Sequence, residues 1–205
     1  MTHKGTMWLD DKVMVSDPCY DLGIWCQGVI ENVLPGEYIC LAKYVDKGRW
    51  GTRVAAIQAV HHDYINSDLK ETLEPFEVGV DGGSAGIFDY KHYERHHSGK
   101  EQDKLWHDRC YDATISMTRN PDYEEFEWNI EDESVDAMMK RHDEYRNSTK
   151  SQAYFTKLDA NVVYGSGFVS SSGYGDGGYS CWTAKNEDGK VVSIRVEFIS
   201  EEDDE

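Results

Sequence analysis

The sequence predicts an α+β fold, a mainly antiparallel β-sheet or sandwich with a helical insertion in the middle of the chain. Short apolar runs of strand length, separated by proline and glycine, fill most of the first ninety residues. A charged stretch with helical spacing follows, and the C-terminal part returns to strand patterns. With 205 residues in total, we expect one domain over residues 1–200 with a helical insertion at about 90–150, and an acidic tail at 201–205.

The first predicted strands are short and end at turn residues. Residues 13–16 (VMVS) end at Asp17-Pro18, because proline cannot donate a hydrogen bond to a β-ladder. Residues 28–34 and 37–45 flank Pro35-Gly36, which fits a type II turn, so we expect these two runs to form a hairpin. Two more apolar runs of strand length follow at 53–61 and 76–80.

The middle of the chain changes to helical spacing. Between residues 90 and 117 there is no proline, and apolar residues recur along a predicted helix at Leu105, Ile115 and Met117, with Trp106 and Cys110 beside them. After a break at Asn120-Pro121, residues 134–146 predict a second helix with Ser134 as its N-cap. Because this region is charged and thinly apolar, we expect it to cover one face or edge of the sheet.

The C-terminal part predicts a hairpin. Residues 161–164 and 179–185 have strand composition, and Asp188-Gly189 is typical of a two-residue type I′ turn. In the strand that follows, apolar and polar residues alternate, which indicates an antiparallel strand buried on one face. The apolar set is Val192, Ile194, Val196 and Phe198, and the polar set is Ser193, Arg195 and Glu197.

The net charge of −18 argues against ordinary nucleic-acid binding, because such a surface repels a phosphate backbone. Much of the excess lies in the tail and in residues 122–133, which hold seven acids and no base. Charge runs of this kind are usually solvated segments. The alternative is that they imitate DNA and occupy a DNA-binding enzyme of a host.

The sequence carries no pattern typical of membrane-spanning, secreted, disulfide-bonded or zinc-ribbon proteins. No apolar run approaches the roughly 20 residues that span a bilayer, and the first residues lack the apolar core of a signal peptide, so we expect a cytoplasmic protein and no membrane partner. The five cysteines contain no C-x-x-C pair, which favours reduced thiols over a disulfide framework or a zinc ribbon. The sequence does not indicate an oligomeric state.

Three segments share one design, an acid beside chain-bending residues directly after a predicted strand. They are 16–20 (SDPCY), 80–86 (VDGGSAG) and 172–178 (SGYGDGG). If the three strands are neighbours, Asp17, Asp81, Asp89 and Asp176 converge at one end of the sheet.

These segments predict a ligand pocket. Glycine lets backbone N–H groups turn inward and lets a ligand approach the main chain, serines add donors, and a tyrosine can stack on a ring. The alternative is structural: aspartates bond their own backbone in turns, and glycines supply a positive φ. The candidate ligand-binding residues are Asp17, Tyr20, Asp81, Ser84, Asp89, Ser172, Gly173, Tyr174, Gly175 and Asp176.

Catalytic motifs are weak, and no catalytic residue or cofactor is predicted. The four aspartates could hold magnesium or calcium for a hydrolysis, although no D-x-D-x-D-G loop is present.

His92 and His96 have the i, i+4 spacing that can chelate a transition metal. However, Tyr93 replaces the glutamate of H-E-x-x-H, and a polar helix face is the favoured interpretation. Residues 173–178 match G-x-G-x-x-G yet lead into a strand, which excludes a dinucleotide fingerprint. Whether a metal binds stays open.

Two motifs resemble an uncharacterised family, the domain-of-unknown-function family 4241. They are VGVDGGSAGIFD at 78–89 and SSGYGDGGYSCWTAKNEDGKVVSIRVEF at 171–198. The opening VSDPCY…WC is similar to uncharacterised phage-encoded proteins. The resemblance implies no activity, substrate or catalytic residue, but it suggests that the motifs act as a set.

The sequence therefore favours a non-catalytic binding protein, a phage accessory protein in the host cytoplasm that captures a small molecule, such as a nucleotide-like ligand, or blocks a host protein. Two alternatives stay open. One is a metal-dependent hydrolase that uses the clustered aspartates, and the other is the acidic mimic of DNA.

Overall fold

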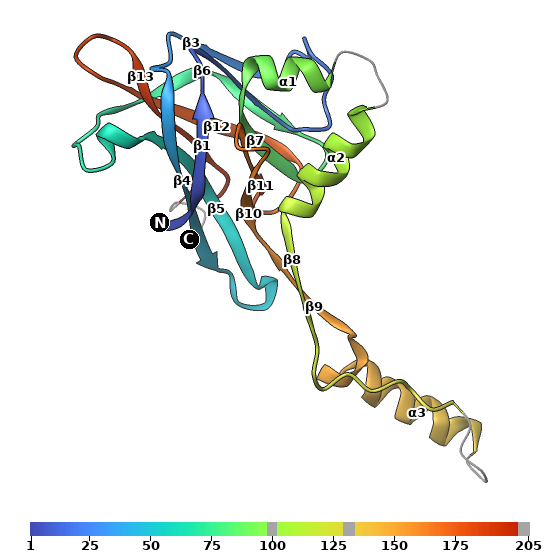
Figure 1. Cartoon of the computed structure of the whole chain (residues 1–205). Helices are drawn as coiled ribbons and strands as arrows, with labels where there is room; N and C mark the ends of the chain where they lie inside the picture. The colour runs from blue at the N-terminus through green and yellow to red at the C-terminus, as the bar shows by residue number, and fades with distance from the viewer. Residues whose placement is uncertain (98–101, 129–133, 201–205) are drawn as a thin grey trace. The chain divides into compact units, whose positions relative to one another are not determined.

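The computed structural model describes residues 1–97, 102–128 and 134–200 (Figure 1). It contains two compact units, one formed by Met1–Ile115 with Leu158–Glu205 and the other by Ser116–Lys157. The single domain expected over 1–200 stays a prediction, since compactness does not show whether a unit folds independently. The acidic tail lies outside the described residues.

The first unit is built on two antiparallel sheets, as the sequence predicts for an α+β sandwich. The six-stranded sheet has the spatial order β1 (Thr2–Leu9), β4 (Gly36–Asp46), β5 (Thr52–His61), β13 (Val191–Glu197), β12 (Gly177–Lys185) and β6 (Glu71–Val80). The five-stranded sheet has the order β10 (Ala160–Val163), β11 (Gly167–Ser171), β7 (Ser84–Asp89), β2 (Lys12–Ser16) and β3 (Gly28–Glu31). Short 3-10 turns lie at Gly48–Trp50 and His62–Tyr64.

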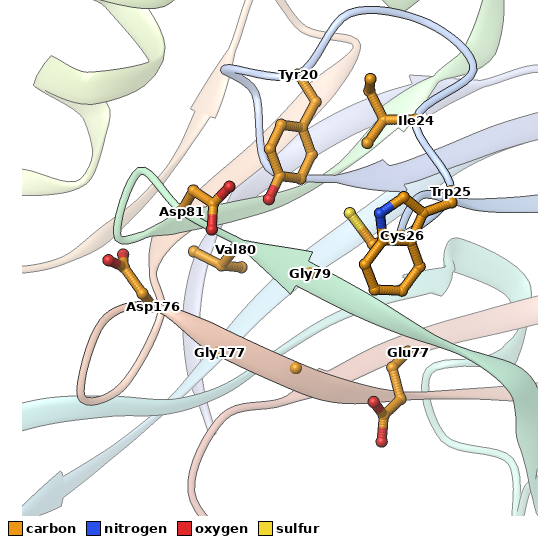
Figure 2. Close-up of a pocket in the computed structure, with 11 residues that line it drawn as sticks. Tyr20, Ile24, Trp25, Cys26, Glu77, Gly79, Val80, Asp81, Asp176 and Gly177 are labelled. Carbon is orange, nitrogen blue, oxygen red and sulfur yellow. The ribbon is translucent and has the colours of Figure 1, made fainter.

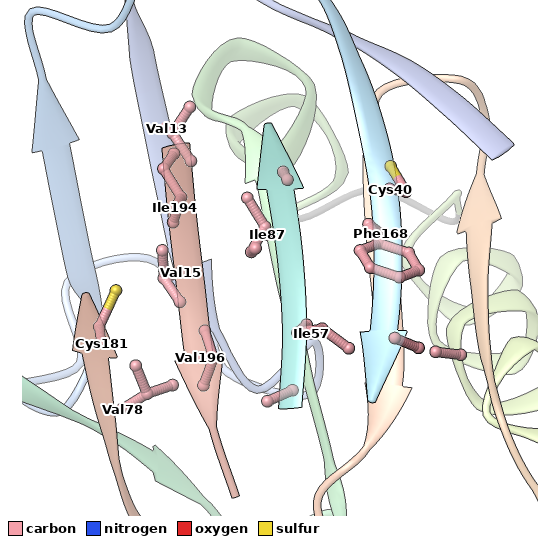
Figure 3. Packing of buried hydrophobic residues seen from close by; sticks show 14 of the residues in the cluster. Val13, Val15, Cys40, Ile57, Val78, Ile87, Phe168, Cys181, Ile194 and Val196 are labelled. Carbon is pink, nitrogen blue, oxygen red and sulfur yellow. The ribbon is translucent and has the colours of Figure 1, made fainter. Parts of the chain in front are cut away.

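The main core lies between the two sheets. Val13, Val15 and Ile87 of the five-stranded sheet share one buried cluster with Ile194 and Val196 of the six-stranded sheet (Figure 3). The apolar set predicted for the last strand, Val192, Ile194, Val196 and Phe198, is buried as expected, but Ser193 of the polar set is buried too, so the strand does not alternate cleanly.

A second core covers the other face of the five-stranded sheet. Met14 and Phe88 pack there against Tyr93 of helix α1 (Tyr90–His96) and Trp106 of helix α2 (Gln102–Ala113). Because β2 and β7 are buried on both faces, their central residues, 13–15 and 85–88, form unbroken runs without charged or polar side chains instead of alternating. The helices therefore cover one face of a sheet, as expected.

The second unit is a small two-stranded sheet, β8 (Ile115–Arg119) with β9 (Tyr154–Leu158), together with helix α3 (Val135–Arg146) and a 3-10 turn at Thr149–Ser151. Ser134 caps α3 as predicted, accepting a hydrogen bond from the N–H of Ala137. No described residue of α3 is buried. None of the described helices has the length and apolar character that crossing a bilayer requires.

Three predicted elements are wrong. The hairpin around Pro35-Gly36 does not form, because β3 pairs with β2 whereas β4 pairs with β1 and β5. The chain instead passes from one sheet to the other at Val33, which bridges Val191. Proline followed by glycine is a local turn signal, and the inter-sheet core outweighs it.

The helix expected up to Met117 ends at Ala113, and Met117 lies exposed in β8. Leu105 is 63% exposed, so the buried face of α2 is set by Trp106 and Cys110 instead. The hairpin at Asp188-Gly189 does form, but its connection runs from 186 to 190 with only Gly189 at positive φ, so it is not a two-residue type I′ turn.

Candidate functional site

One corner of the sandwich brings the three acid-containing segments together. Strands β2 and β11 both run antiparallel to β7, with Ser16 opposite Gly86 and Ser171 opposite Ser84. The residues after β2 and β11 therefore meet the loop that precedes β7. Strand β6 leads into that same loop, and its Val80 pairs with Gly177 of β12. Asp17, Asp81 and Asp176 thus lie on neighbouring loops.

Asp17 is fully buried and holds the corner together. Its carboxylate accepts hydrogen bonds from three backbone N–H groups, at 2.8 Å from Cys19, 3.0 Å from Asp81 and 2.6 Å from Gly82. A carboxylate with three backbone donors is well compensated for its burial. Asp17 therefore positions the 81–83 loop rather than facing a ligand.

The glycine-rich stretch is a closed turn tied to the same loop. The Ser172 hydroxyl donates to the carbonyl of Gly175 at 2.8 Å, and the Tyr179 hydroxyl donates to the carbonyls of both residues. The N–H of Ser172 donates to the carbonyl of Gly83, and the N–H of Gly83 donates to the Asp176 carboxylate at 3.2 Å. Asp176 therefore joins the two loops.

A pocket of about 390 Å³ opens beside this turn (Figure 2). We call it the Trp25 pocket. It is bounded by the loop after β2, the end of β6 and the start of β12. Its lining residues are Tyr20, Ile24, Trp25, Cys26, Glu77, Gly79, Val80, Asp81, Asp176, Gly177 and Gly178.

The walls of the Trp25 pocket combine acids with apolar surface. Glu77, Asp81 and Asp176 are exposed carboxylates, and none of the described lining residues is Lys, Arg or His. Trp25 is 93% exposed, and Ile24 beside it is 38% exposed. An indole left in water at the mouth of a pocket offers a large contact surface to a ligand.

The loop that carries Trp25 is fixed at both ends. The Gln27 side chain accepts hydrogen bonds from the N–H groups of Gly23 and Ile24, and its amide donates to Ser16 and to the Tyr93 hydroxyl. The loop rests on β6 at Gly79, where an added Cβ would lie only 2.7 Å from Cys26 Sγ. Glycine at 79 is therefore required for this close approach.

Tyr20 lines the pocket with its hydroxyl group held in the protonated form. Burial, with hydrogen bonding to Asp81 and Cys26, raises the pKa of Tyr20 far above its ordinary value. The backbone of Tyr20 is held by Tyr93, whose hydroxyl donates to the Tyr20 carbonyl at 2.6 Å. Tyr20 therefore offers a neutral ring and hydroxyl to a ligand.

A smaller pocket of about 230 Å³ lies at the other side of Asp17 and includes Cys19, Ser84 and His107. A thiol near a histidine invites a comparison with nucleophilic enzymes. However, burial together with the carboxylates of Asp17 and Asp81 raises the pKa of Cys19 to about 12. The thiol is therefore protonated at neutral pH, which argues against a cysteine nucleophile.

Nine of the ten predicted site residues divide into three groups. Tyr20, Asp81 and Asp176 line the Trp25 pocket. Tyr174 is exposed and lies outside the lining. The remaining residues of the corner are Asp17, Ser84, Ser172, Gly173 and Gly175, of which Asp17 and Ser84 also line the smaller pocket.

Asp89 does not join the others, so the expected convergence of four aspartates is wrong. It lies at the far end of β7, opposite Val13, where its carboxylate accepts from the N–H of His92 at the start of α1 and from the N–H of Asp10. Among the described residues, no group of three or more His, Cys, Asp or Glu side chains is placed to hold a metal ion.

Sequence patterns missed most of the pocket wall. Trp25, Cys26, Glu77 and Gly79 were not among the predicted site residues, because their convergence depends on the pairing of β6 with β12 and on how the Trp25 loop rests on β6. The one available signal was the Ile24-Trp25 pair, two large apolar residues within a predicted loop.

Fold and site together define a two-sheet α+β protein with an acidic, partly apolar pocket at one corner of its sandwich. The chain belongs to a family described as protein of unknown function (DUF4241), whose model matches residues 10–196. No curated protein and no solved structure matches it significantly.

Proposed function

We propose that this protein is a non-catalytic binding protein that captures a small organic cation in the Trp25 pocket. The observation that carries the proposal is the pocket wall, which has three exposed carboxylates and an exposed indole but no base among its described residues. The volume of about 390 Å³ lies within the usual range for small-molecule sites.

Each part of the wall suits a cation. Glu77, Asp81 and Asp176 supply negative charge and hydrogen-bond acceptors for an amine or a guanidinium group. The indole of Trp25 adds a ring face, on which a cation is stabilised by about 0.5–2 kcal/mol. Ile24 and Val80 supply apolar surface for the carbon skeleton of the ligand.

The same wall disfavours the nucleotide-like ligand expected from the glycine motif. A phosphate would meet three carboxylates without a counter-charge, and the glycine turn satisfies its own backbone groups through Ser172 and Tyr179. The hydrolase alternative stays a prediction, and the geometry supports it less than the binding proposal, because Asp17 is committed to backbone N–H groups and Asp89 lies elsewhere.

The wider biological setting stays a prediction. A phage origin, a host cytoplasm and the blocking of a host protein find no specific support in the geometry. The hypothesis of a DNA mimic rests on residues 122–133 and 201–205, of which 129–133 and the tail lie outside the described residues.

Two measurements test the proposal. Native mass spectrometry of protein taken directly from cells should reveal a bound organic cation. In calorimetric titrations, choline, agmatine or spermidine should bind, whereas AMP should not. Capture of a phosphate-bearing compound, or no binding of any of the three cations, would contradict it.

A pair of charge-neutralising variants sharpens the titration. Glu77→Gln should weaken binding of the cation roughly fivefold, which corresponds to about 1 kcal/mol for one carboxylate. Asp188→Asn is the matched control, because it removes the same charge from the exposed turn between β12 and β13. Equal effects of the two substitutions would indicate only a long-range charge effect and no pocket.

A further inference from the structure

A pair of histidines on α1 lies outside the Trp25 pocket. His92 and His96 are one helical turn apart, and their Nε2 atoms approach to 3.0 Å. Their ring centroids lie 4.6 Å apart. Two imidazole nitrogens at this separation lie close enough to bind one metal ion.

The surrounding aromatic rings hold the pair in this arrangement. Trp106, which is fully buried, stacks on the His96 ring at 4.4 Å with an interplanar angle of 13°. The Tyr164 ring lies 5.6 Å from the ring of His92 and 5.5 Å from that of His96. The helix itself is fixed at its start by the Asp89 cap on the N–H of His92. The two imidazoles are therefore preorganised.

We propose that His92 and His96 form a two-imidazole site for a borderline divalent transition metal, namely Ni²⁺, Cu²⁺ or Zn²⁺. Metal–imidazole bonds of about 2.0–2.1 Å, with the two nitrogens 3.0 Å apart, give an angle at the metal of roughly 90–95°. That angle suits square-planar and octahedral coordination, so Ni²⁺ and Cu²⁺ fit with the least movement. Zn²⁺, which prefers a tetrahedral angle, requires the two nitrogens to separate slightly.

Among the described residues no third metal-binding side chain joins the pair, so the two imidazoles are the protein ligands that the proposal assigns. Hard cations such as Mg²⁺ and Ca²⁺ prefer oxygen ligands and are not expected to bind there. The competing explanation is that the 3.0 Å contact is simply a hydrogen bond, with one imidazole as donor and the other as acceptor.

Nitrogen-15 NMR of the intact chain distinguishes the two explanations without a substitution. During a Zn²⁺ titration, the Nε2 resonances of His92 and His96 should shift together with the first equivalent. That of His62 should stay unchanged, because His62 lies in the 3-10 turn that follows β5 and not on α1. First-equivalent shifts at other histidines, or at neither member of the pair, would overturn the proposal.

Substitutions supply the second readout. His92→Gln and His96→Gln should each lower the calorimetric affinity for Ni²⁺ by about tenfold or more, because either change leaves a single imidazole. His62→Gln is the matched control and should bind like the parent protein. Unchanged Ni²⁺ affinity in His92→Gln would refute the site, and if a variant does not fold, the NMR titration of the parent protein decides. Neither variant should alter cation binding in the Trp25 pocket, so the two proposals fail independently.

Discussion

Asp17 and Asp81 lie on adjacent loops of one corner, yet their carboxylates meet different surroundings. On the Asp17 side, the carboxylate is fully buried and saturated by three backbone N–H groups. On the Trp25 side, the carboxylates of Glu77, Asp81 and Asp176 face an open pocket beside an exposed indole. The difference teaches that the acid-and-glycine motifs both build the corner and supply part of the ligand surface, while Trp25 and Glu77 come from outside those motifs.

The largest expected effect on stability comes from a substitution of Asp17. Asp17→Ala removes the acceptor of three part-buried backbone N–H groups and empties the buried position of the side chain, so we expect a loss of about 3 kcal/mol in the free energy of unfolding. Urea denaturation of the variant and the parent protein measures it. A loss below about 0.5 kcal/mol would mean that the Asp17 side is as permissive as the Trp25 side.

The reactivity of the Cys19 thiol tests the environment on the Asp17 side in a second way. Partial desolvation of the thiol and the neighbouring carboxylates raise the pKa of Cys19 from 9.0 to about 12, so its thiolate is scarce at pH 8 although the residue as a whole is exposed. After allowing for the greater nucleophilicity of a high-pKa thiolate, alkylation by iodoacetamide should be about thirtyfold slower in the folded protein than in urea. Equal rates would reopen the possibility of a cysteine nucleophile.

The glycine turn is expected to give a smaller effect. Gly173 has a φ of 58°, and an added Cβ would lie 3.0 Å from both Phe198 and Ile199. Gly173→Ala should therefore cost about 2 kcal/mol of unfolding free energy. Tyr174→Ala, which removes an exposed side chain from the same turn, is the control and should cost little. Loss of cation binding in step with stability would identify the turn as a structural support.

The parts of this architecture that could be predicted are those that depend on local sequence patterns and not on long-range strand pairing. The alternation of Val192, Ile194 and Val196 depends only on the two-residue period of a strand, and it was visible in the sequence. The meeting of Asp17 with the 81–83 loop was predictable because each acid directly follows a strand. The predicted convergence of Asp89 with the other aspartates was wrong because β7 was not foreseen. The six residues of β7 carry Asp89 roughly 16 Å from the corner.

The path of the chain at Pro35-Gly36 and the composition of the pocket wall depend on long-range pairing, which local sequence patterns do not show. The Pro35-Gly36 signal is the same whether the flanking strands pair with each other or enter different sheets, and the core decides between the two. Glu77 enters the pocket wall because β6 pairs with β12, and Trp25 because its loop rests on Gly79. Neither could be inferred from the neighbouring residues.

The smallest expected effect on stability coincides with the largest on binding, and it gives the most direct test. Trp25→Ala removes a side chain that is 93% exposed, so the free energy of unfolding should change by less than about 0.5 kcal/mol. The affinity for the cation that binds the parent protein should fall about tenfold, as expected when a cation loses its aromatic partner. Trp50→Ala, a change at another exposed tryptophan outside the pocket, should alter neither quantity. Unchanged affinity in Trp25→Ala, measured by calorimetry beside urea denaturation of the same sample, would contradict the assignment of the Trp25 pocket as the binding site.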